Sequence, residues 1–166
     1  MIKYQDDKYQ RIVGDILENE EFNKIRYIEH HGTTRFEHSV RVSYFSYRFA
    51  RLFHLDYEEV ARAGLLHDFF LSDQDRNQKD RILSTFNHPK KACMNSCRIF
   101  GLNEKEEDII ESHMFPLNIR VPKYAESWVV SCVDKVVGAI EFVEKARYKA
   151  IYLGNVYILC LINIVK

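Results

Sequence analysis

Four histidines and two aspartates occupy positions where an ionisable side chain is costly to bury. They are His38, His67, Asp68, His88, His113 and Asp134. His67 and Asp68 stand inside the apolar run GLLHDFF, and burying such groups costs several kcal/mol unless they are paired or bound to a metal. Imidazole nitrogen suits zinc, iron and nickel, whereas carboxylate oxygen suits harder ions. One shared metal site would compensate all six residues at once.

Two metal ions could be held by this set if one carboxylate bridges them. Asp68 is the natural bridge, because adjacent residues on a helix diverge by about 100°. His67 could then reach one ion while Asp68 spans both. Each residue also has a simpler explanation. A lone histidine on an apolar face is usually a core residue, His88 could cap its helix, and Asp134 could pair with a lysine or arginine. Asp68 could accept hydrogen bonds from backbone amides. The metal hypothesis is favoured because it explains the whole set.

The elements that must position these residues are predicted to be helices, since apolar residues recur with helical periodicity and strand alternation is not evident. The predicted helices cover about residues 4–19, 22–29, 35–53, 57–69, 89–101, 103–113 and 123–146. Asp56 with Glu59, and Asn103 with Glu106, have the spacing of a helix-capping pair. Pro89 suits the first position of a helix. We therefore expect an all-α, single-domain helical bundle over residues 1–166, with an apolar C-terminal tail at 148–166.

Helical spacing also predicts which way the candidate ligands face. His38 shares a face with an apolar stripe that indicates a core position; the stripe is Val42, Phe45, Phe49 and Leu52. His67 follows Ala63 by four residues, and His113 follows Ile109 by four residues. Asp134 shares its face with two valines, and Gly138, one turn later, leaves room for a close approach. The candidates should therefore point toward the interior.

The composition excludes some classes of binding partner and indicates the cellular compartment. The 24 basic and 24 acidic residues cancel, which argues against a nucleic-acid-binding surface. Four cysteines without regular spacing, Cys93, Cys97, Cys132 and Cys160, indicate reduced thiols in a cytoplasmic protein. The start MIKYQDDKYQ is too polar for a signal peptide. The apolar run 151–165 is shorter than the about 20 residues of a membrane span. A buried terminal helix or strand is the favoured interpretation of the run, and an oligomer contact is the next.

Three local segments, RFEHSVRV, AGLLHDFF and SCVDKVV, resemble the motif segments of the HD-domain superfamily of metal-dependent phosphohydrolases. The resemblance covers about residues 22–147. His88 in NHPKKA and His113 in ESHMFPL match the two extra histidines of its binuclear branches. Those branches include the symmetrical dinucleoside-tetraphosphate hydrolases and the cyclic-dinucleotide phosphodiesterases. The resemblance implies a bundle with two central divalent ions, drawn from Fe, Mn, Co, Ni, Zn and Mg. One ion would take His38, His67, Asp68 and Asp134, and the other Asp68, His88 and His113.

The sequence departs from two family patterns. Mononuclear nucleotidases of the family carry an acidic general base after the His-Asp pair, where this chain reads FFLSDQD and offers only Asp73 or Asp75. The Gly-Tyr-Pro motif of one phosphodiesterase branch does not occur. The resemblance therefore implies hydrolysis by a metal-activated hydroxide, held at the bridging Asp68, without a side-chain base.

The implied substrate is a small phosphorylated molecule, nucleotide-like in character. Arg35 lies one turn before His38, Lys91 follows His88 by three residues, and Lys135 adjoins Asp134. These three cations are the expected phosphate contacts, and ordinary surface charges are the alternative. A competing function is a non-catalytic module in which metals brace the fold and the cleft binds a phosphorylated signalling ligand. No membrane partner is expected, and a homo-oligomer stays open.

Overall fold

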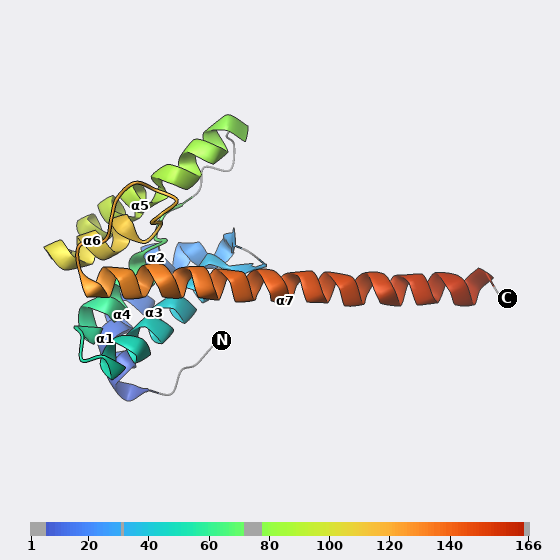
Figure 1. The fold of residues 1–166 in the computed structure, drawn as a ribbon, viewed down its shortest axis with the longest axis horizontal. Coiled ribbons are helices and arrows are strands. Elements are labelled where there is room, and N and C mark those ends of the chain that lie inside the picture. Colours follow the sequence, from blue (N-terminus) through green and yellow to red (C-terminus); the bar gives the residue numbers. More distant parts are fainter. Residues whose placement is uncertain (1–5, 31, 72–77, 165–166) are drawn as a thin grey trace.

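The computed structural model describes residues 6–30, 32–71 and 78–164, and Figure 1 shows their arrangement. Its helices are α1 (Asp7–Leu17), α2 (Glu20–Asn23), the 3-10 helix η1 (Lys24–Tyr27), α3 (Arg35–Leu52), α4 (Tyr57–Leu66), α5 (Gln78–Phe100), α6 (Glu104–Ser112) and α7 (Ala125–Ile164). The extended structure among the described residues is one antiparallel pair, β1 (Glu29–His30) with β2 (Thr33–Thr34). The predicted all-α fold is confirmed, although α2, η1 and β1 replace the single helix expected over 22–29.

Caps fix where three of the site-bearing helices begin. The Asn103 side chain accepts from the backbone N–H groups of Lys105 and Glu106 at the start of α6, and Glu106 completes the predicted capping box. Asp56 caps α4 by accepting from the backbone of Glu59. A second capping box, Thr34 with Glu37, starts α3 and was not predicted from the sequence. Such caps are worth about 1 kcal/mol each, and they set the register of the ligands that follow.

The centre of the bundle is the contact between α3 and α4. A Cβ added at Gly64 would lie 3.2 Å from the Ser43 Cα, so the two backbones approach closely there. The Ser43 hydroxyl donates to the carbonyl of Ala61 at 2.6 Å and accepts from the Tyr9 hydroxyl at 2.9 Å. These buried hydrogen bonds tie α1, α3 and α4 together. They hold α3, which carries His38, against α4, whose last residue is followed by His67.

The predicted start of the fifth helix at Pro89 is wrong. Helix α5 begins at Gln78 and continues through Pro89, which lies inside it. A proline ring removes one backbone hydrogen bond and normally disfavours such a position. Here His88 and Pro89 are both buried, so packing against the bundle outweighs the local preference. Asp73 and Asp75 lie outside the described residues.

The stripe on α3 is buried at one end only. Val42 is fully buried beside His38, but Phe45, Phe49 and Leu52 are 48%, 46% and 72% exposed. The prediction of one continuous core face is therefore wrong for its second half. All four residues share one helical face, but none of the described residues covers its second half, which forms the wall of a groove instead.

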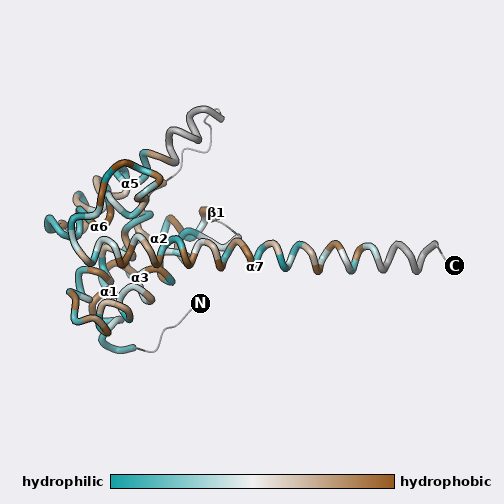
Figure 2. Tube along the Cα trace, viewed as in Figure 1, coloured by the Kyte–Doolittle hydropathy of each residue, from teal (hydrophilic) through white to brown (hydrophobic). Residues whose placement is uncertain are grey.

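Helix α7 is 40 residues long and projects well beyond the bundle (Figure 1). The prediction of a separate, buried terminal element is wrong, because the helix continues through residue 146 to Ile164 and residues 142–157 are exposed. Along the described part of this projection apolar and polar residues alternate (Figure 2). None of the described helices combines the length and apolarity that a membrane crossing requires.

The cysteines with described side chains are free thiols. Cys93 and Cys97 lie one helical turn apart with 4.0 Å between their sulfur atoms, and Cys132 is exposed. Burial raises the pKa of the Cys93 thiol to about 12. The side chain of Cys160 lies outside the described residues.

Candidate metal centre

Five helices bring the six predicted ligands into one cluster. His38 comes from α3, His67 and Asp68 from the end of α4, His88 from α5, His113 from the end of α6, and Asp134 from α7. All of them are buried except Asp134, whose side chain is 16% exposed. Their donor atoms form three overlapping groups, within each of which all atoms lie within 4.8 Å of one another; the groups are His38–His67–Asp68, His67–His113–Asp134 and Asp68–His88–His113. The residues predicted from the sequence therefore do meet.

One half of the cluster is centred on Asp134. Its Oδ1 atom lies 3.0 Å from His38 Nε2 and 3.5 Å from His67 Nε2. His67 Nε2 is a buried ring nitrogen without a hydrogen-bond partner. A buried polar atom in that state is costly, and a cation beside it would remove the cost.

The other half joins His88 and His113, whose Nε2 atoms lie 3.0 Å apart. Asp68 Oδ1 lies 3.1 Å from His88 Nε2 and 3.8 Å from His113 Nε2. The second carboxylate oxygen of Asp68, Oδ2, lies 3.9 Å from His67 Nε2. Asp68 thus directs one oxygen toward each half, which is the arrangement that a bridging ligand requires.

Helix ends fix the orientation of two of the imidazole rings. His67 Nδ1 lies 2.8 Å from the carbonyl of Gly64, and His113 Nδ1 lies 2.7 Å from the carbonyl of Ile110. A carbonyl only accepts, so Nδ1 carries the proton in both rings and the lone pair is on Nε2. Each histidine follows the last residue of its helix, where carbonyls lack intrahelical partners. The backbone therefore directs both lone pairs into the cluster.

Glu141 is a participant that sequence reasoning missed. Its Oε2 atom accepts from His38 Nδ1 at 2.8 Å, and its Oε1 atom accepts from Arg41 at 3.1 Å. The carboxylate is 1% exposed. Glu141 follows Asp134 by seven residues, close to two helical turns, so its place on the same face of α7 was a signal that could have found it.

Charge in the cluster is unevenly distributed. Burial would lower the pKa of His38, but hydrogen bonds to Asp134 and Glu141 raise it to about 10. Burial, together with the neighbouring His67, lowers the pKa of His113 to about 3. Burial would raise the pKa of Asp134, but the hydrogen bond with His38 and the nearby His67 hold it well below its ordinary value. At neutral pH this favours an ionised Asp134 and a neutral His113, the forms in which these side chains bind metals.

These observations fit divalent metal ions. Four imidazole nitrogens and two carboxylates converge, two ring lone pairs are fixed inward, and one buried nitrogen lacks a hydrogen-bond partner. Second ring nitrogens hydrogen-bonded to carbonyl or carboxylate oxygen are the usual support for metal-binding histidines.

The three predicted phosphate contacts differ in their surroundings. Arg35 is buried, its guanidinium carbon lies 3.8 Å from the centre of the Phe70 ring, and it donates to the Phe70 carbonyl. Burial lowers the pKa of Arg35, partly offset by the charge of Asp68. Lys91 is half-buried and lines a cavity of about 310 Å³ next to Phe70. Arg35 and Lys91 therefore both lie beside Phe70, whose ring stacks on His88 with 5.1 Å between ring centres.

Lys135 has a structural role in this arrangement. Its ammonium group donates to the carbonyl of His113 at 2.8 Å and to the carbonyl and hydroxyl of Ser131, both at 2.9 Å. Those three bonds match the three donors of an ammonium group. Phosphate binding by Lys135 stays a prediction, and it would require one of these bonds to break.

Comparison with known proteins gives one match. The sequence model of the HD domain matches residues 35–151 of the chain. The matched segment begins at Arg35 and contains all six cluster residues. No curated protein and no solved structure matches the chain significantly.

Proposed function

The chain belongs to the HD-domain family, and because that family includes metal-dependent hydrolases, we propose that the chain hydrolyses a phosphate ester or anhydride of a small nucleotide-like molecule. The observation that carries this proposal is the position of Asp68, whose two oxygens face different halves of the cluster. A structural zinc site is normally closed and four-coordinate. Six ligands divided between two halves leave coordination positions for water and substrate.

We propose that His38, His67, Asp68 and Asp134 hold one ion, and that Asp68, His88 and His113 hold a second. Divalent ions at such a site supply charge neutralisation at phosphoryl oxygens and a lowered pKa for water. The chain's own contribution is to fix the ligands. Backbone carbonyls orient His67 and His113, and Glu141 orients His38.

Arg35 and Lys91 are the proposed phosphate contacts. Arg35 is held by Phe70 next to Asp68, and Lys91 lies one turn after His88. Fixed cations that neutralise a phosphoryl group contribute to catalysis by electrostatic stabilisation. The Phe70 ring lies against Arg35 and lines the cavity of Lys91, and in such a partly apolar setting charge interactions are stronger than in water.

The test is metal analysis of anaerobically purified protein followed by hydrolysis assays. Phosphomonoesters, phosphodiesters and dinucleoside polyphosphates should be offered with Fe²⁺, Mn²⁺, Co²⁺, Ni²⁺, Zn²⁺ or Mg²⁺. We expect metal-dependent release of phosphate or nucleotide by the wild type, and its loss in Asp68→Asn. Metal binding with no turnover of any substrate would instead support the non-catalytic, metal-braced module.

A further inference from the structure

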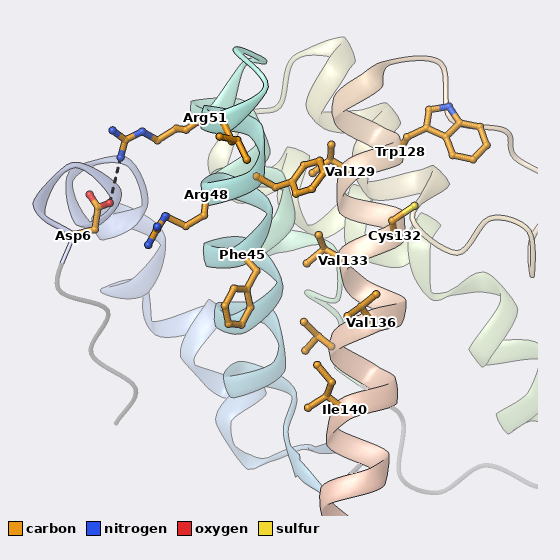
Figure 3. A pocket seen from close by; sticks show the side chains of 13 residues that line it. Asp6, Phe45, Arg48, Arg51, Trp128, Val129, Cys132, Val133, Val136 and Ile140 are labelled. Atoms are coloured by element: carbon orange, nitrogen blue, oxygen red, sulfur yellow. Dashed lines mark hydrogen bonds and ion pairs between the residues drawn. The ribbon is translucent and has the colours of Figure 1, made fainter.

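An apolar groove runs along the outside of the bundle between α3 and α7 (Figure 3). Its volume is about 1080 Å³, and Phe45 and Phe49 line it from α3 while Val133, Val136 and Ile140 line it from α7. Val136 and Ile140 are 58% and 52% exposed. Arg48 and Arg51 lie at its rim, where Arg51 pairs with Asp6 at 3.4 Å. None of the six cluster residues lines the groove, and neither does Glu141, so it is separate from the metal centre.

The projecting part of α7 is a second apolar surface without a covering element among the described residues. Residues 142–164 extend about 35 Å at 1.5 Å per residue. Tyr152 and Tyr157 are 67% and 65% exposed, and residues 150–164 contain no charged side chain. Large apolar side chains exposed along an uncharged helical segment are normally covered by another element. One flanking helix would cover only one side, whereas a groove between two helices covers more.

The projection cannot fill the groove of its own molecule. The α7 wall of the groove and the projection are successive parts of one continuous helix, and the projection leads away from the bundle (Figure 1). The apolar face continues along this helix, from Val133, Val136 and Ile140 to Val143 and Ile151. A second copy presents the same two surfaces, so a twofold axis can satisfy both with one contact type.

We propose that two copies of the chain form a dimer in which the α7 projection of each lies in the α3–α7 groove of the other. The two α7 helices run antiparallel, with the axis near residues 145–146. This register places residues 133–140 of one copy opposite residues 151–158 of the other. It also places Glu144 opposite Arg147 of the partner subunit, which pairs opposite charges on either side of the axis.

The area of this contact suits a stable dimer. A fully exposed aromatic side chain loses about 150–250 Å² on burial. Phe45 and Phe49 are about half exposed and Tyr152 and Tyr157 about two thirds exposed, so these rings contribute roughly 900 Å² over the two reciprocal contacts. The half-exposed Val136, Ile140, Val143 and Ile151 bring the total toward the roughly 1,600 Å² of a standard interface. The proposal does not depend on the proposed hydrolase activity, since its residues lie outside the metal cluster.

The experiment measures the mass of the full chain by sedimentation. The wild type should be a dimer. Val136→Glu in the groove and Ile151→Glu in the projection should each raise the dissociation constant about 100-fold or more, because each would bury an unpaired charge. Both side chains are at least half exposed, so the fold should persist, as circular dichroism can verify. Ile119→Glu, at a fully exposed loop position, is the matched control and should leave the dimer unchanged.

Mixing the two variants gives the sharper result. The intact projection of Val136→Glu fits the intact groove of Ile151→Glu, so the mixture should form a heterodimer although each variant alone is monomeric. Failure of the mixture to associate would overturn the reciprocal arrangement. A dimer that survives Val136→Glu would exclude the groove. A monomeric wild type would overturn the proposal. If that monomer binds phosphatidylcholine–phosphatidylglycerol vesicles, the apolar surface is covered by a lipid surface and not by a second copy.

Discussion

At the residue scale, the cluster depends on side chains that fix its ligands as well as on the ligands. His38 is oriented by Glu141, a buried carboxylate on a helix face shared with Asp134. We expect Glu141→Gln to weaken metal binding about 10-fold or more, as the loss of such a supporting group does elsewhere. Competition titration with a chromophoric chelator measures this directly. Glu58→Gln is the control, because Glu58 is an exposed glutamate in the first turn of α4, outside the cluster and the groove. Equal affinities in both variants would contradict the positioning role.

The two halves of the cluster predict two different losses of metal. His113→Ala removes a ligand of one half only, so the metal content should fall to about one ion per chain while the fold persists. Asp68→Asn removes the carboxylate that faces both halves and should weaken both ions together. Elemental analysis after gel filtration distinguishes the two outcomes. An unchanged stoichiometry in His113→Ala would argue against a second ion.

Acid sensitivity should be a property of the metal-free protein. The folded-state pKa of His113 is lowered to about 3 from an ordinary value of 6.5. As the pH falls, this histidine therefore takes up a proton in the unfolded chain before it does so in the folded protein. The free energy of unfolding then decreases between about pH 6.5 and pH 3, by up to about 1.4 kcal/mol per pH unit. His38 acts in the opposite direction. Its pKa is raised to about 10, so its contribution to the free energy of unfolding is fully present below about pH 6.5 and is lost as the pH rises toward 10.

Melting temperatures of chelated protein across this pH range test the assignment. The maximum should lie near pH 6.5, and His113→Gln should flatten the acidic side while leaving the alkaline side in place. Metal should reduce the acid sensitivity of the wild type, because neutral imidazoles are held as ligands. An acidic slope that persists in His113→Gln would assign it to another group.

At the element scale, the spacing of α3 and α4 determines whether His38 and His67 meet. A Cβ at Gly64 would approach the Ser43 Cα to 3.2 Å, and a backbone atom can yield only if the helices separate. We expect Gly64→Ala to destabilise the fold by about 1–3 kcal/mol, less about 1 kcal/mol from improved helix propensity. Metal affinity should fall with it. Gly14→Ala in α1, where nothing lies within 4 Å, should instead stabilise by up to about 1 kcal/mol. Denaturant unfolding compares the two variants.

Elements with local signals were predictable from the sequence. Helices α4 and α6 begin where Asp56 and Asn103 cap them, and the six cluster residues could be chosen because ionisable groups in apolar settings need a partner. Two other elements escaped prediction because tertiary context decides them. Pro89 looks like a helix start until the buried surface around it is known. The stripe through Phe45 and Phe49 has core periodicity, yet periodicity does not tell what covers a face.

At the scale of the whole molecule, metal should act as a brace. The ligands come from five separate helices, so an ion bound in the folded state has no preformed site in the unfolded chain. Saturating metal at about 100 times its dissociation constant should stabilise the protein by about 2.7 kcal/mol. Thermal unfolding with and without chelator measures the shift. Asp68→Asn should show little of it, and an equal shift in that variant would place the stabilising ion elsewhere.

Helix α7 carries two kinds of surface on adjacent sides. Asp134 and Glu141 face the cluster, while Val136 and Ile140 face the groove. An α-helix is stiff, so a tilt that moves one face moves the other. Occupancy of the cluster and occupancy of the groove are then thermodynamically linked, and such coupling is reciprocal. If a bound metal ion strengthens self-association by some factor, self-association must strengthen metal binding by the same factor. The fraction of chains that carry metal would then depend on the concentration of the protein.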